Sequence, residues 1–227
     1  MIDRPSPNHD ARPAGKATDI LLLHYTGMRD AESALARLTD PAAKVSSHYL
    51  IDEDGTAYRL VEEGRRAWHA GASWWGGERD VNGVSIGIEL VNPGHEFGYR
   101  AFPPAQMQAL IGLCRDILAR HPIPPARVLG HSDVAPRRKR DPGELFDWRG
   151  LAAAGIGLWP APAEGPTDLA AVQMALARYG YELRPTGQMD PETRAALIAF
   201  QRHFRPARID GLADTETRAL IYGAALR

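Results

Sequence analysis

The chain has 227 residues, of which 44% are hydrophobic and 24% charged, and this balance is typical of a folded globular protein with one large and one small domain. A formal net charge of −1 argues against a nucleic-acid-binding protein, and the apolar runs are too short to form a membrane segment. The single cysteine, Cys114, excludes an intramolecular disulfide.

The N-terminal half predicts strands and helices in alternation. Residues 1–18 are polar and rich in proline, so we expect coil there. The apolar run at 20–25 predicts a buried central strand that ends near His24. The elements expected after it are a helix at 30–38, a hairpin at 47–61, a glycine- and tryptophan-rich loop at 67–77 and an alternating strand at 84–91.

The middle of the chain continues this α/β pattern. A long helix is expected at 103–120, with Cys114 on its apolar stripe, followed by a short strand at 127–130 and a helical turn at 144–148. Together these elements predict an α/β fold in which a mixed central β-sheet is flanked by helices.

The C-terminal part has a different pattern. Residues 155–166 are rich in glycine and proline and are expected to form a linker between a domain at 1–154 and a second domain at 167–227. Beyond the linker the sequence predicts helices at 168–179, 191–204 and 215–226, which would form a small all-α three-helix domain.

The polar segment 129–143 carries residues that bind metals. His131 and Asp141 are both common zinc ligands, and they would meet if the segment between them folded back. Catalytic zinc sites use three protein ligands, and His24 at the end of a buried strand is the best candidate for the third. The sequence therefore predicts one Zn²⁺ per chain, held by His24, His131 and Asp141, with one coordination position open.

Two further residues fit hydrolysis of an amide at such a site. A zinc ion polarises a carbonyl and acidifies water, so a carboxylate is needed to move the proton of the water to the leaving nitrogen. Glu89, on the predicted strand at 84–91, is the candidate acid/base. Lys139 would lie on the same side of an extended segment as Asp141 and is the candidate that stabilises the oxyanion.

The loop at 67–77 supplies weaker candidates. Trp68 and His69 are candidate substrate contacts, although His69 would equally serve as a brace for the loop. Trp74 and Trp75 would either stack on a sugar or cover an edge of the sheet. His48, in the hairpin, is expected to be structural. The histidines that show no partner pattern, and are expected at the surface, are His9, His95, His121 and His203.

Several of these segments together resemble a known family. In order and spacing they are similar to the zinc-dependent N-acetylmuramoyl-L-alanine amidases of the AmpD/AmiD type, which are related to phage-lysozyme-like amidases and to peptidoglycan recognition proteins. The resemblance covers roughly residues 18 to 150 and rests on residues 22–26, 67–71, 85–90 and 130–143.

The resemblance implies a function and a role for each site residue. It makes His24, His131 and Asp141 the zinc ligands, Glu89 the catalytic acid/base and Lys139 the residue that stabilises the transition state. It implies hydrolysis of the amide between N-acetylmuramic acid, including its 1,6-anhydro form, and L-alanine of the peptidoglycan stem peptide, in cell-wall recycling or turnover.

The C-terminal helices carry a second resemblance. Residues 186–194, 199–201 and 209–211 are similar to motifs of the small helical peptidoglycan-binding domain that accompanies many such enzymes. This similarity implies that the partner is peptidoglycan or a muropeptide.

Other functions and two locations remain open at this point. A non-catalytic peptidoglycan-binding protein is the alternative, but the presence of all three ligands together with Glu89 and Lys139 favours an enzyme. A peptidase based on Cys114 is disfavoured, because an apolar helix stripe is a poor setting for a reactive thiol. The polar N-terminus has no export-signal pattern and favours the cytoplasm, whereas the wall-binding-like domain keeps the periplasm or cell envelope as the alternative.

Overall fold

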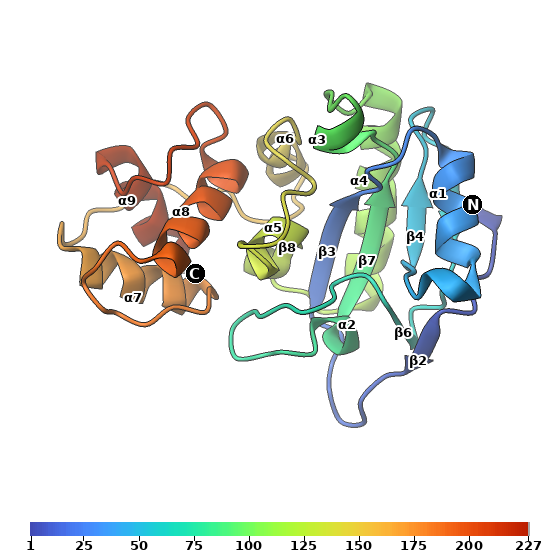
Figure 1. The fold of residues 1–227 in the computed structure, drawn as a ribbon, viewed down its shortest axis with the longest axis horizontal. Coiled ribbons are helices and arrows are strands. Elements are labelled where there is room, and N and C mark those ends of the chain that lie inside the picture. The colour runs from blue at the N-terminus through green and yellow to red at the C-terminus, as the bar shows by residue number, and fades with distance from the viewer. Residues whose placement is uncertain (227) are drawn as a thin grey trace.

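The computed structural model describes residues 1–226, in which a mixed β-sheet carries helices on both faces and three further helices pack at one edge (Figure 1). Within these residues the sheet has six strands in the order β1-β5-β4-β7-β3-β8, and β2 pairs with β6 in a separate ribbon. The strands are β1 (Ile2–Asp3), β2 (His9–Ala11), β3 (Ile20–Tyr25), β4 (Tyr49–Ile51), β5 (Ala57–Arg59), β6 (Arg65–Ala67), β7 (Ser85–Leu90) and β8 (Val128–Gly130).

The helices lie between the strands and after the last of them. The sheet belongs to the part of the chain that ends with α6, and the last three helices follow a segment without regular structure at 155–166. None of the helices in residues 1–226 is long and apolar enough to span a membrane. The helices are α1 (Ala31–Thr39), η1 (Pro41–Ala43), α2 (Val81–Val84), α3 (Gly94–Phe97), α4 (Pro104–Arg120), η2 (Pro125–Arg127), α5 (His131–Val134), α6 (Trp148–Ala153), α7 (Leu169–Tyr179), α8 (Pro191–Phe204) and α9 (Thr215–Ala225).

The side chains of strand β7 project to both faces of the sheet. They alternate, so Ile86, Ile88 and Leu90 point to one face and Glu89 points to the other. The isoleucines and Leu90 share a core with the apolar stripe of α4, which lies behind the sheet in Figure 1. Cys114 is buried in this core, and burial raises the pKa of its thiol, which leaves it unreactive as expected.

The face of the sheet that carries Glu89, called the Glu89 face below, is covered by helices in two separate places. Helix α1 packs over Leu50 of β4 at one side. At the other side Ile20 and Leu22 of β3 belong to a core that includes residues of α7, α8 and α9. The polar residues near the carboxyl ends of β3 and β7 lie between these covers, and this placement positions the candidate site.

Most predicted elements are confirmed. The central strand occupies 20–25, and α1 begins after Asp30, whose Oδ1 accepts a hydrogen bond of 2.8 Å from the Ser33 amide. The hairpin is formed by β4 and β5, which pair antiparallel. The three C-terminal helices also begin after aspartates, Asp168, Asp190 and Asp214, each of which caps its helix.

The prediction of coil for residues 1–18 was wrong at residues 2–3 and 9–11, and it is confirmed for the rest of that stretch. Ile2–Asp3 pair in parallel with β5, and His9–Ala11 pair antiparallel with β6. Neither short strand contains a proline, so their amides are free to join a ladder. The strand expected at 84–91 also begins one residue later, because Val84 completes the short helix α2.

The segment after β8 differs from expectation in two places. It opens with the one-turn helix α5 rather than with an irregular loop. The helical turn expected at 144–148 is absent from the described residues; helix α6 starts at Trp148 instead, because Asp147 accepts a hydrogen bond from the Gly150 amide and caps it there. His203, expected at the surface, is also buried, with 2% exposed.

Candidate metal centre and catalytic site

The site forms where neighbouring parallel strands end. His24 of β3 and Glu89 of β7 are register partners, so their side chains project from the same face of the sheet. Strand β8 lies on the other side of β3 and ends at Gly130, which places His131 beside them. Open sheets with parallel strands commonly place their ligands at this carboxyl edge.

The segment after β8 folds back on itself, as the metal prediction required. The Ser132 amide donates a hydrogen bond of 2.9 Å to the Asp141 carbonyl, which returns Asp141 to the side of His131. Gly130 permits this approach, because a Cβ atom there would lie 2.7 Å from the Pro142 ring. The close return of the chain therefore depends on a residue without a side chain.

Three buried ligand atoms meet at the site. His24 Nδ1 lies 3.0 Å from His131 Nδ1 and 3.0 Å from Asp141 Oδ2, and His131 Nδ1 lies 3.0 Å from the same carboxylate oxygen. The exposed fractions of the three residues are 1%, 3% and 6%. The structure thus brings together the three residues that the sequence proposed as ligands, in a group that could hold a metal ion.

The outer nitrogen of His131 fixes its tautomer. Nε2 lies 2.9 Å from the Ala70 carbonyl oxygen, which can only accept a hydrogen bond. Nε2 therefore carries the hydrogen, and Nδ1 of the neutral ring presents a lone pair towards Asp141.

A chain of hydrogen bonds fixes the tautomer of His24 in the same way. The Ser85 hydroxyl donates to the Val81 carbonyl at 2.6 Å, so its oxygen accepts from His69 Nε2 at 3.3 Å. His69 Nδ1 then has a lone pair and accepts from His24 Nε2 at 3.1 Å. His24 Nδ1 is left as an acceptor, like Nδ1 of His131.

With both rings in their neutral forms, two imidazole lone pairs and a carboxylate oxygen converge with no hydrogen between them. Such an arrangement is repulsive unless a cation lies among the three atoms. Two histidines and one aspartate are a donor set that suits zinc, and outer hydrogen bonds that orient the ligand rings are typical of zinc sites. Burial lowers the pKa of His24 to about 4, so the ring is neutral near pH 7, as a metal ligand must be.

Glu89 has the properties expected of an acid/base beside this cluster. It is 9% exposed, and its Oε2 atom has no hydrogen-bond partner anywhere in residues 1–226. Burial raises the pKa of Glu89 well above its usual value; the charge of Asp141 adds to the rise and that of Lys139 opposes it. Lys139 is partly exposed and acts electrostatically on both Glu89 and His24.

Sequence reasoning missed two residues that hold the backbone next to the ligand histidines through hydrogen bonds. The Asn82 side-chain oxygen accepts hydrogen bonds from the amides of His69 and Ala70 at 3.0 and 2.8 Å. Arg138 donates to the carbonyls of Ala70 and Ala72 at 2.7 and 2.8 Å. Neither Asn82 nor Arg138 was among the candidates that the sequence offered.

The weaker candidates in the loop lie in different settings. His69 is 6% exposed and contacts His24, which matches the alternative of a brace. Trp68 is partly exposed and donates to Asp10 at 2.7 Å. Trp74 is partly exposed beneath the guanidinium of Arg79, 4.6 Å from the ring centre. Direct contact of these three residues with substrate stays a prediction.

His48 and Trp75 have structural surroundings. His48 accepts a hydrogen bond from the Gly87 amide at 3.0 Å, and its Nε2 donates to the Arg65 carbonyl at 3.1 Å. Trp75 is 1% exposed and packs edge-on against Tyr179 and Tyr181, so it is closed to a sugar.

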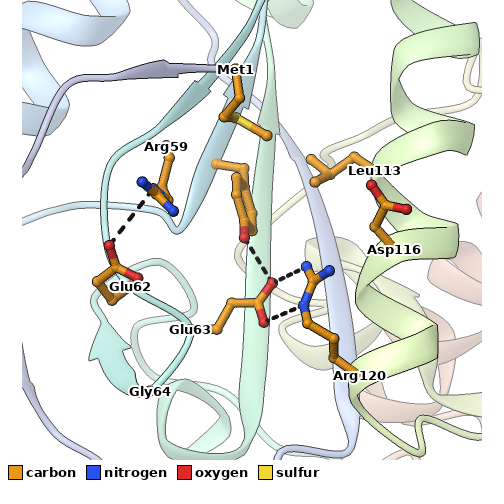
Figure 2. Close-up of a pocket in the computed structure, with 9 residues that line it drawn as sticks. Met1, Arg59, Glu62, Glu63, Gly64, Leu113, Asp116 and Arg120 are labelled. Atoms are coloured by element: carbon orange, nitrogen blue, oxygen red, sulfur yellow. Dashed lines mark hydrogen bonds and ion pairs between the residues drawn. The ribbon is translucent and has the colours of Figure 1, made fainter.

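A hollow of about 400 Å³ lies on the opposite face of the sheet (Figure 2). Tyr49 in its wall pairs in register with Ile88 and therefore points away from the Glu89 face. Glu63 accepts hydrogen bonds from Tyr49 at 2.7 Å and from Arg120 at 2.7 and 3.2 Å. Burial alone would raise the pKa of Glu63, but these donors and His121 lower it to about 2.

Comparison with known families assigns two parts of the chain. The sequence profile of the N-acetylmuramoyl-L-alanine amidase family matches residues 14–144. A profile of peptidoglycan-binding domains matches residues 166–221. The first match contains all three converging ligands as well as Glu89 and Lys139.

Individual relatives are similar over different lengths. N-acetylmuramoyl-L-alanine amidase AmiD of Escherichia coli is 44% identical over 235 residues, which cover 92% of this chain and 83% of AmiD. The 1,6-anhydro-N-acetylmuramyl-L-alanine amidase AmpD of Escherichia coli is 34% identical over 161 residues, 63% of this chain and 86% of AmpD.

Solved structures extend the likeness to the fold. AmiD from Escherichia coli, in complex with its substrate anhydro-N-acetylmuramic acid-L-Ala-D-γ-Glu-L-Lys, matches with a TM-score of 0.81 at 42% identity, over 94% of this chain and 91% of AmiD. AmpDh3 from Pseudomonas aeruginosa matches with a TM-score of 0.83 at 37% identity, over 93% of this chain and 92% of AmpDh3.

Proposed function

Because the chain belongs to the N-acetylmuramoyl-L-alanine amidase family, we propose that His24, His131 and Asp141 bind one catalytic zinc ion and that the site hydrolyses muramoyl-L-alanine amides. The observation that carries this proposal is the convergence of two imidazole nitrogens and a carboxylate oxygen beside the buried Glu89, whose Oε2 atom has no hydrogen-bond partner within residues 1–226. A non-catalytic binding protein would have no need of that arrangement.

The residues of the chain divide the chemistry between them. A zinc ion in the site supplies positive charge that polarises the amide carbonyl and acidifies a water molecule. Glu89 takes the proton of the attacking water at its free carboxylate oxygen and delivers it to the leaving nitrogen of L-alanine. Lys139 places a positive charge beside Glu89 and His24, where it offsets the negative charge that develops on the amide oxygen.

The substrate class follows from the relatives. AmiD has been solved with an anhydro-muropeptide as its substrate, and this chain covers 91% of that structure. AmpD carries the 1,6-anhydro sugar in its name. We therefore infer that this enzyme acts on N-acetylmuramic acid linked to a stem peptide, including the 1,6-anhydro form, in the recycling or turnover of the cell wall.

We also propose a division of labour along the chain. Residues 1–154 form the amidase domain, residues 155–166 are the linker, and residues 167–227 contact peptidoglycan. The similarity of residues 166–221 to peptidoglycan-binding domains supports this division. Action on small soluble fragments would fit recycling in the cytoplasm, and action on the polymer would fit the cell envelope.

A single set of assays tests these proposals on the full chain. We expect one zinc per chain by elemental analysis, and release of the stem peptide from anhydro-muropeptide that stops with chelator and returns with zinc. His131→Ala should lose both the zinc and the turnover, whereas the control His121→Ala, on the opposite face, should keep both. Full turnover by the metal-free protein would contradict the zinc site.

The same assay with intact sacculi tests the substrate. Faster release from the soluble muropeptide than from sacculi would support the recycling role, and the reverse order would support action on the wall. Sedimentation of the inactive His131→Ala chain with sacculi measures binding separately from cleavage. A chain that neither cleaves nor binds either form would contradict the assignment of peptidoglycan as the partner.

A further inference from the structure

The C-terminal helices are joined to the sheet region by a closely packed contact. Trp75 of the 67–77 loop lies with its ring centre 5.2 Å from that of Tyr179 and 5.1 Å from that of Tyr181. The Gly76 amide donates a hydrogen bond of 2.9 Å to the Gly180 carbonyl, and a Cβ atom on Gly180 would lie 2.3 Å from the indole. The two regions therefore share one core and are not connected by the linker alone.

A buried carboxylate lies within this contact. Asp133 is 1% exposed and accepts three hydrogen bonds, one from the Gly130 amide at 2.8 Å, one from the Tyr181 hydroxyl at 2.9 Å and one from His203 Nδ1 at 2.8 Å. Two of the three donors come from the C-terminal helical region. A carboxylate with so little access to water depends on such donors for its stability.

Asp133 belongs to the one-turn helix that carries a metal ligand. Helix α5 spans only His131–Val134, and so short a helix has little stability of its own. Its position must come from tertiary contacts. The Asp133 carboxylate accepts hydrogen bonds from the Gly130 amide at the end of β8 and from Tyr181 and His203 of the C-terminal region. His131 lies in the chain between Gly130 and Asp133, so these hydrogen bonds restrain the backbone on both sides of it.

The ring of His203 is itself fixed from the other side. It stacks on Trp148 of α6, with the ring centres 3.7 Å apart and the planes at 20°. A Cβ atom on Gly130 would lie 3.2 Å from the same indole. His203 is thus held at one geometry, with its donor nitrogen directed at Asp133.

We propose that Tyr181 and His203 are positioning residues for the metal centre, which act through Asp133 to hold His131 in place. The C-terminal helices then have a second role besides contact with peptidoglycan, because they complete the amidase site. This inference rests on the proposed zinc site but adds residues outside the amidase match at 14–144.

Variants of the full chain separate the hydrogen bonds from the packing. His203→Phe keeps a flat ring against Trp148 and removes the donor, whereas His203→Asn keeps a donor close to the Nδ1 position and removes the ring. Tyr181→Phe removes one hydroxyl. The matched control is Tyr222→Phe, because the Tyr222 hydroxyl donates to the Pro166 carbonyl within the C-terminal region, away from Asp133.

Three measurements on each variant give the test: zinc affinity by chelator competition, the absorption spectrum with Co²⁺ in place of zinc, and urea unfolding. We expect His203→Phe and Tyr181→Phe to raise the zinc dissociation constant about tenfold and to change the Co²⁺ spectrum. His203→Asn should bind zinc more tightly than His203→Phe. Tyr222→Phe should stay within about twofold of the wild type.

The outcomes distinguish the inference from the proposed function. If Tyr181→Phe and His203→Phe unfold more easily but bind zinc like the wild type with an unchanged Co²⁺ spectrum, the residues serve the fold alone and the inference is overturned. If the wild type binds no zinc, the proposed zinc site falls and the inference falls with it.

Discussion

Two glutamates on opposite faces of one sheet have opposite surroundings. Glu63, in the hollow of Figure 2, accepts hydrogen bonds from Tyr49, Arg120 and His121, and its pKa falls to about 2. Glu89 is more deeply buried, and its Oε2 atom finds no partner in the part of the chain that the structure describes. Its pKa rises accordingly.

The difference shows which buried charge is available for chemistry. A carboxylate whose lone pairs are all taken by donors contributes to stability and has no free atom for a substrate. A carboxylate buried without donors costs stability, and a protein retains such a group where the group acts on something else. Glu89 and the three ligand atoms beside it lack donors in this way, whereas the carboxylate oxygens of Glu63 all accept hydrogen bonds.

Removal of the charge at each glutamate tests the comparison most directly. We expect Glu89→Gln to lower kcat by a factor of about 10² to 10⁴, because the proton acceptor is lost, while the zinc content stays at one per chain. Its unfolding free energy should not fall, since Gln needs no desolvation of a charge. Turnover of anhydro-muropeptide and elemental analysis of the same preparation measure both quantities.

The matched control is Glu63→Gln. It removes a charge of the same type from the opposite face, so kcat should stay at the wild-type value. Equal losses of activity in the two variants would contradict the distinction between the faces.

Zinc affinity tests the comparison at the level of the histidines. His69→Phe removes the acceptor of the His24 Nε2 hydrogen and should weaken zinc binding by a factor of about 10 to 100. Tyr49→Phe, which removes a donor of Glu63, should leave the zinc dissociation constant unchanged. Chelator competition measures both, and an unchanged affinity in His69→Phe would show that His69 does not orient the ligand.

The sequence predicted the fold where the local pattern and the tertiary structure agree. The apolar run at 20–25 and the alternation at 85–90 identified the two strands that carry His24 and Glu89, because period-2 alternation and burial follow directly from side-chain type. The metal ligands at 131 and 141 were likewise predicted, because histidine and aspartate are common zinc ligands and both stand in one short polar segment. The glycine that lets that segment fold back, Gly130, stands within it.

The supporting residues could not be predicted, because their partners are distant in the chain. Asn82 acts through backbone amides of His69 and Ala70, which any residue types would supply. His203 lies 70 residues from Asp133, and on the sequence alone it was placed at the surface. Its burial follows from the packing of two regions against each other, which local periodicity does not encode.

The pH dependence of stability provides the smallest and most specific test of the Glu63 cluster. A carboxylate whose pKa is lowered to about 2 by folding stabilises the native state above its unfolded pKa of 4.5, and this contribution is lost as the pH falls towards 2. Because Glu63 is partly exposed, water screens its ion pair, and Glu63→Gln should lower the unfolding free energy at pH 6 by at most about 1 kcal/mol.

The gap between wild type and Glu63→Gln should therefore narrow between pH 6 and pH 3.5, as measured by urea unfolding with the m-value held in common. We expect the opposite trend for Glu89, because folding raises its pKa. As the pH falls, the unfavourable buried charge is neutralised, so the unfolding free energy of the wild type rises relative to that of Glu89→Gln. If the unfolding free energy of each variant ran parallel to that of the wild type across this pH range, neither carboxylate would have a pKa altered by folding. The contrast between the two faces would then be wrong.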